Sequence, residues 1–117
     1  MMDQTVMHKV SKEQARAAQS CAKKSEEKGK KVEAFGKIIE ASVDRVTEAQ
    51  GKSIELAGKE TQRYAIASYE HAQVAESTGS QQELNQAAVE HAKESNEEVK
   101  AVKVYGEIVR NQNCQRR

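Results

Sequence analysis

The fold is decided at Ser77-Thr78-Gly79-Ser80, where two long helix-forming segments meet. Gly79 suits the left-handed residue that follows a helix, and Ser80 suits the N-cap of the next helix, with Glu83 three residues further on. A link this short predicts an antiparallel helical hairpin. We expect a turn at residues 78–80, a last helix over residues 81–111 and a frayed tail over residues 112–117.

Composition supports long helices packed around a thin core. The length of 117 residues predicts one domain. The chain lacks proline and is 37% hydrophobic. It holds sixteen Ala and eleven Val but only two Leu and one Phe. Because small side chains bury little apolar area, we expect much of the stability to come from association or from long helix contacts. The expected fold class is therefore all-α, a coiled-coil-like bundle that forms homo-oligomers.

An eleven-residue repeat runs through the region before the hairpin turn, and its period of about 3.67 residues per turn favours slight right-handed supercoiling. One column of the repeat continues into Ala65, and a second column lies three residues further on in each repeat. With the apolar positions of the last helix, these columns predict the packing or interface residues. They are Val10, Cys21, Val32, Phe35, Val43, Val46, Ile54, Ala57, Leu84, Val99, Val102 and Val109.

The segment Lys23–Lys31 is a second candidate break, because it is polar around its whole circumference and contains Gly29. If the chain turns there, residues 3–28 form a helix that folds back on a central helix over residues 31–77. If it does not, one helix runs from residue 3 to residue 77. The polar segment favours the bend, and the uninterrupted column favours continuity. The segment carries a surplus of three positive charges, which fits either a patch for phosphate, membrane or acidic protein, or a solvated stretch.

Four glycines fall inside the expected helices at a regular spacing. Gly29 and Gly36 are seven residues apart, as are Gly51 and Gly58. Each helix-interior glycine costs about 1 kcal/mol relative to alanine. Two interpretations follow: a close approach of helices along a strip of small residues, or a metastable helix that orders only on binding.

Sequence motifs for catalysis are lacking, and we expect no enzyme, no metal and no cofactor. The three histidines have no metal-ligand spacing, and the carboxylates fall at helical spacing from lysines. The balance of 19 basic and 18 acidic residues argues against nucleic acid as a partner. No stretch is apolar enough to span a membrane, and two widely separated cysteines suit a reducing compartment. We therefore expect a cytoplasmic location.

Several short stretches within residues 32–111 form a pattern: Val32-Glu33-Ala34-Phe35, Arg63-Tyr64-Ala65 followed by Ser68-Tyr69-Glu70, and Ser80-Gln81-Gln82-Glu83-Leu84 with Glu97-Glu98. In this pattern the chain resembles a phasin, the family that coats polyhydroxyalkanoate storage granules. The resemblance implies a helical protein without catalytic residues. The eleven-residue repeat is also similar to late-embryogenesis-abundant proteins. This chain departs from phasins in its few Leu and Phe residues.

Two functions follow as expectations. The first is a non-catalytic structural protein that self-assembles or coats a granule or other surface through amphipathic helices. The alternative is a small helical adaptor, chaperone or inhibitor, of the phage or secretion-system type, that binds one specific protein.

Overall fold

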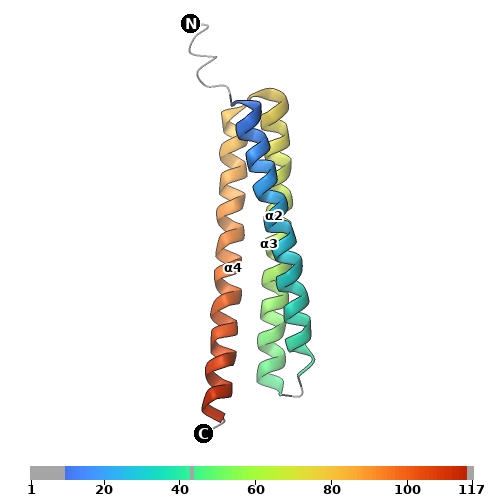
Figure 1. The fold of residues 1–117 in the computed structure, drawn as a ribbon, viewed down its shortest axis with the longest axis vertical. Helices are drawn as coiled ribbons and strands as arrows, with labels where there is room; N and C mark the ends of the chain where they lie inside the picture. Colours follow the sequence, from blue (N-terminus) through green and yellow to red (C-terminus); the bar gives the residue numbers. More distant parts are fainter. Residues whose placement is uncertain (1–9, 43, 116–117) are drawn as a thin grey trace, which may run out of the picture.

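The computed structural model describes residues 10–42 and 44–115. Three long helices account for nearly all of them: α2 (Lys12–Glu40), α3 (Arg45–Thr78) and α4 (Gln81–Gln115). They lie side by side along a rod about 70 Å long (Figure 1). None of these residues lies in a strand, and none of the helices is long and apolar enough to cross a membrane. The all-α class and the hairpin with an extra N-terminal helix are thus confirmed.

The turn between α3 and α4 forms where the sequence predicts it, but the last helix was predicted too short: α4 continues to Gln115, through residues 112–115 that were expected to be a frayed tail. Gly79 has a φ of 71°, the left-handed conformation that glycine adopts without strain, and its N–H donates to the Ala75 carbonyl at 2.8 Å. The Ser80 hydroxyl accepts from the Glu83 N–H at 3.2 Å. The carbonyl of Gly79 also accepts a hydrogen bond from the N–H of Val10, which joins the start of α2 to this end of the rod.

The other turn was placed wrongly from the sequence. The chain neither bends at Lys23–Lys31 nor runs as one helix to residue 77, because α2 continues to Glu40 and α3 begins at Arg45. Asp44 makes this break by capping α3: its side chain accepts from the Val46 N–H at 3.2 Å and from the Thr47 hydroxyl at 2.8 Å. The Lys23–Lys31 segment remains helical because its buried residues, Ser25 and Gly29, lie on the core side of α2.

Helices α2 and α3 meet along a seam of small residues that repeats every seven positions. Four buried residues of α2 face four of α3 in antiparallel order. A Cβ added to Gly36 would lie 2.3 Å from the Glu55 backbone nitrogen and 2.7 Å from the Gly51 carbonyl oxygen. The glycines therefore permit backbone contact, and the close-approach interpretation is correct. The seam residues are Ala15, Ala22, Gly29 and Gly36 on α2, and Gly51, Gly58, Ala65 and Ala72 on α3.

This seven-residue seam replaces the eleven-residue column as the organising pattern. Cys21 is exposed, because the heptad places Ala22 in the seam instead. Phe35 and Val46 are also exposed, since Gly36 and Gly51 bring the two backbones together beside them. Val43 lies outside the described residues.

Helix α4 packs mainly on α3 and closes a core of two separate apolar clusters. The cluster near the α2–α3 turn contains Ile54, Ala57, Ala101 and Ile108. The cluster at the opposite end contains Val10, Ala15 and Ala75. In the middle of the rod, between the two clusters, each helix also buries polar side chains: Ser25, Thr61, Ser68 and Glu94.

Candidate functional site

The polar section of the core holds a carboxyl pair on α4. Glu94 is only 1% exposed, and its carboxylate lies 3.3 Å from His91 Nδ1. One oxygen of Glu98 is buried without a hydrogen-bond partner. Burial, together with the hydrogen bond to Glu94 and its negative charge, raises the pKa of Glu98 to about 7, which the charges of Lys28 and His91 oppose. Glu98 thus keeps its proton to a higher pH than an ordinary glutamate does.

The raised pKa of Glu98 makes the free energy of unfolding fall as the pH rises from about 4.5 to about 7. In that range the unfolded chain has released the Glu98 proton, whereas the folded chain retains it. Unfolding therefore releases a proton, and the free energy of unfolding decreases with pH. The contribution is full below about pH 4.5 and lost above about pH 7. The pKa values of Glu33 and Glu76 are lowered chiefly by hydrogen bonds from Gln62 and Gln19. These two groups therefore affect the free energy of unfolding only at lower pH than this range.

Glu98→Gln should therefore flatten the pH dependence of stability. We expect wild-type protein to lose on the order of 1–2 kcal/mol between pH 5 and 7, and the variant to lose much less. Urea unfolding followed by circular dichroism across this range measures the effect. Glu107→Gln, at an exposed position of the same helix, is the matched control. An unchanged slope in Glu98→Gln would show that Glu98 does not hold the proton.

The described residues offer no metal centre, because no group of three or more His, Cys, Asp or Glu side chains is placed to hold an ion. Glu98 instead lines a groove between α2 and α4 with a volume of about 550 Å³. Ile54 and Ala101 form part of its floor. The remaining lining residues are Lys28, Lys31, Val32, Phe35, Val102 and Tyr105. A groove of this composition favours contact with apolar matter over a small polar substrate.

Large apolar side chains are exposed chiefly in the half of the rod near the α2–α3 turn. Eight of the eleven lie there, and four of these eight line the grooves that α2 and α4 border: Phe35, Ile38, Val102 and Tyr105. We call this side the α2–α4 face. We include in it the exposed Val99 and Val109, which lie on the same side of α4 as Val102.

Regular helical spacing builds this face from both helices. On α4, Val99, Val102 and Val109 lie at steps of three and seven, with Gly106 between the last two, so they share one side of the helix. Tyr105 contacts Phe35 of α2 in an edge-to-face arrangement, with ring centroids 5.2 Å apart. Val102, which lines the groove with Glu98, is 70% exposed, and Ile38, which lines an adjoining groove with Phe35 and Tyr105, is 72% exposed. Exposed apolar side chains gathered on one side make this face a candidate interaction surface.

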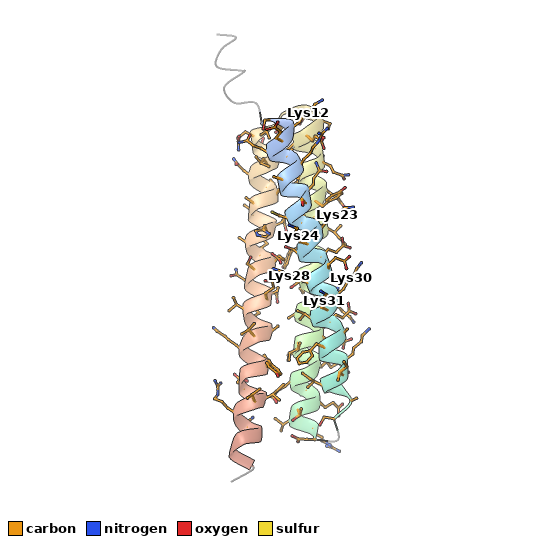
Figure 2. The ribbon with its side chains drawn as sticks, viewed as in Figure 1. Lys12, Lys23, Lys24, Lys28, Lys30 and Lys31 are labelled. Atoms are coloured by element: carbon orange, nitrogen blue, oxygen red, sulfur yellow. The ribbon has the colours of Figure 1, made fainter. Side chains whose placement is uncertain are left out.

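On the side of α2 that belongs to the α2–α4 face, basic residues come first along the chain and apolar residues follow. Lys24, Lys28, Lys31, Phe35 and Ile38 follow one another at steps of four and three, which places them in one line along the helix. In Figure 2, Lys28 lies on the side of α2 toward α4, whereas Lys23 and Lys30 lie on the side away from it. Three lysines thus precede the apolar part of the same line.

The residues predicted for packing divide between the core and this face. Val10, Ile54 and Ala57 are buried, and Val32 and Leu84 are half-buried. The exposed ones on the α2–α4 face are Phe35, Val99, Val102 and Val109. Val46 is exposed on the other side of the rod, in a groove between α3 and α4.

Sequence reasoning missed Ile38 and Tyr105 on this face and the carboxyl pair of Glu94 and Glu98. The alternating spacing of four and three residues from Lys24 to Ile38 could have predicted that these residues share one side of α2. The carboxyl pair gives a weaker signal, since Glu94 and Glu98 are four apart like many surface residues.

Comparison with known proteins adds no relative: no family model, no curated protein and no solved structure matches this chain. The phasin resemblance therefore stays a prediction.

Proposed function

We propose that this chain is a non-catalytic structural protein that coats an apolar surface through its α2–α4 face. The observation that carries the proposal is the exposure of six large apolar side chains on that one side of the rod. A side chain such as Val102 gains roughly 1.5–3 kcal/mol when it is fully removed from water. Several acting together would hold the rod lengthwise on a surface, as the phasin resemblance implies. We further propose a cytoplasmic location, because its two cysteines are widely separated.

Competition for a hexadecane emulsion tests this proposal while cancelling the unspecific adsorption common to all proteins. Wild-type protein is mixed in equal amount with the Ile38→Ser/Val102→Ser variant, and the protein recovered from the droplets is quantified by mass spectrometry. We expect wild-type protein to be enriched about tenfold or more, since two exposed aliphatic side chains are lost from the contact.

The control variant carries equally polar changes on another side of the rod. Val46 and Leu56 are 60% and 54% exposed and line grooves between α3 and α4. Val46→Ser/Leu56→Ser should compete equally with wild-type protein. Equal recovery of the Ile38→Ser/Val102→Ser variant would reject the α2–α4 face as the adsorbing surface.

A further inference from the structure

The α2 side of the α2–α4 face carries a line of basic residues. Along α2, Lys24, Lys28 and Lys31 lead directly into the apolar residues Phe35 and Ile38. The apolar part of the face is thus preceded by three cations on α2, two of which, Lys28 and Lys31, line its groove.

Acidic groups near these cations are compensated. Glu27, next to the line of lysines, pairs with Lys30 at 3.4 Å. Glu98 lies within the groove, where burial and Glu94 raise its pKa to about 7, so much of it is uncharged near neutral pH. Overall, α2 has eight basic and five acidic residues, whereas α4 has four basic and six acidic ones. The basic surplus therefore belongs to the helix that carries the line of lysines.

We propose that the surface covered by the α2–α4 face is an anionic lipid surface. This inference rests on the proposed coating function and names the chemistry of the surface. Apolar side chains at the level of the acyl boundary and lysines at the level of the headgroups are the arrangement by which helices lie in a lipid interface. Lysines near an anionic membrane are each attracted to it, so several in one line act together.

Flotation with lipid vesicles tests the charge requirement. Full-length protein is mixed with vesicles of phosphatidylcholine, with or without one third phosphatidylglycerol. We expect binding about tenfold tighter or more with phosphatidylglycerol, weakening as salt is added. Equal binding to both kinds of vesicle would overturn the inference.

Two triple variants of equal charge separate this face from general attraction. Lys24→Gln/Lys28→Gln/Lys31→Gln removes the line of lysines and should weaken binding to phosphatidylglycerol vesicles about tenfold or more. The control changes Lys12, Lys23 and Lys52 to Gln, and should weaken binding less than about threefold. Figure 2 labels all of these lysines except Lys52. They are exposed, so circular dichroism should show both variants folded. Equal loss in the two variants would overturn the inference.

The remaining outcomes separate this inference from the coating function. Protein that fails to bind phosphatidylglycerol vesicles but still wins the emulsion competition would overturn the lipid assignment alone. Failure in both assays would overturn both. Sedimentation equilibrium decides whether a second copy covers the face. A dimer that becomes monomeric in Ile38→Ser/Val102→Ser, without vesicle binding by wild-type protein, would replace lipid by self-association.

Discussion

Replacing Gly36 and Gly58 together by alanine should destabilise the protein by about 3–5 kcal/mol, although alanine is the better helix former. At Gly58 the added Cβ would lie 2.3 Å from the Glu33 backbone nitrogen, and at Gly36 it would lie equally close to that of Glu55. Backbone atoms cannot rotate away as side chains can, so α2 and α3 must separate. Urea unfolding followed by circular dichroism measures the loss.

Gly106→Ala is the matched control, because it lies in a helix with open space beside it. The nearest atom to its added Cβ is a nitrogen of the Arg110 guanidinium at 3.9 Å. Helix propensity should then dominate, with a gain of about 0.5–1 kcal/mol. If the double variant at the seam were stabilised like Gly106→Ala, the close approach of α2 and α3 would be wrong.

Ile54→Asp should unfold the bundle or destabilise it by at least about 4 kcal/mol. Ile54 is 1% exposed and belongs to the apolar cluster near the α2–α3 turn, where a carboxylate would replace an aliphatic side chain packed against Ala57, Ala101 and Ile108. Thermal and urea unfolding measure the change. Glu48→Ala, an exposed position on the same helix, should change stability by less than about 0.5 kcal/mol. Equal effects of the two substitutions would show that Ile54 does not support the core.

The hairpin turn could be predicted because its chemistry is local. Gly79 supplies the left-handed residue and Ser80 the cap, so four residues suffice to define it. The turn at residues 41–44 requires no positive φ at its described residues and therefore no glycine. Its signal is Asp44 with Thr47 three residues later, a capping pattern that also occurs on helix surfaces. From the sequence, this turn was predicted at Gly29 instead, but Gly29 lies inside α2, where it allows close packing against α3.

The α2–α4 face could be predicted only in part, because its residue types do not distinguish core from surface. Phe35 and Val102 were predicted to be packing residues, because large apolar side chains are usually buried in the core. In this protein the α2–α3 contact is made by glycine and alanine. The larger side chains next to the seam are therefore exposed to solvent. Their exposure depends on how α2 and α3 pair, and the sequence of either helix alone does not indicate it.

Environment-sensitive fluorescence at single positions tests the coating function most directly. An acrylodan label is attached to Val102→Cys or to Leu56→Cys, with Cys21 and Cys114 changed to serine, and its emission is recorded with and without hexadecane droplets. The α2–α4 face predicts a strong blue shift at position 102 and little change at position 56. Equal shifts at both positions, or a larger shift at position 56, would contradict it.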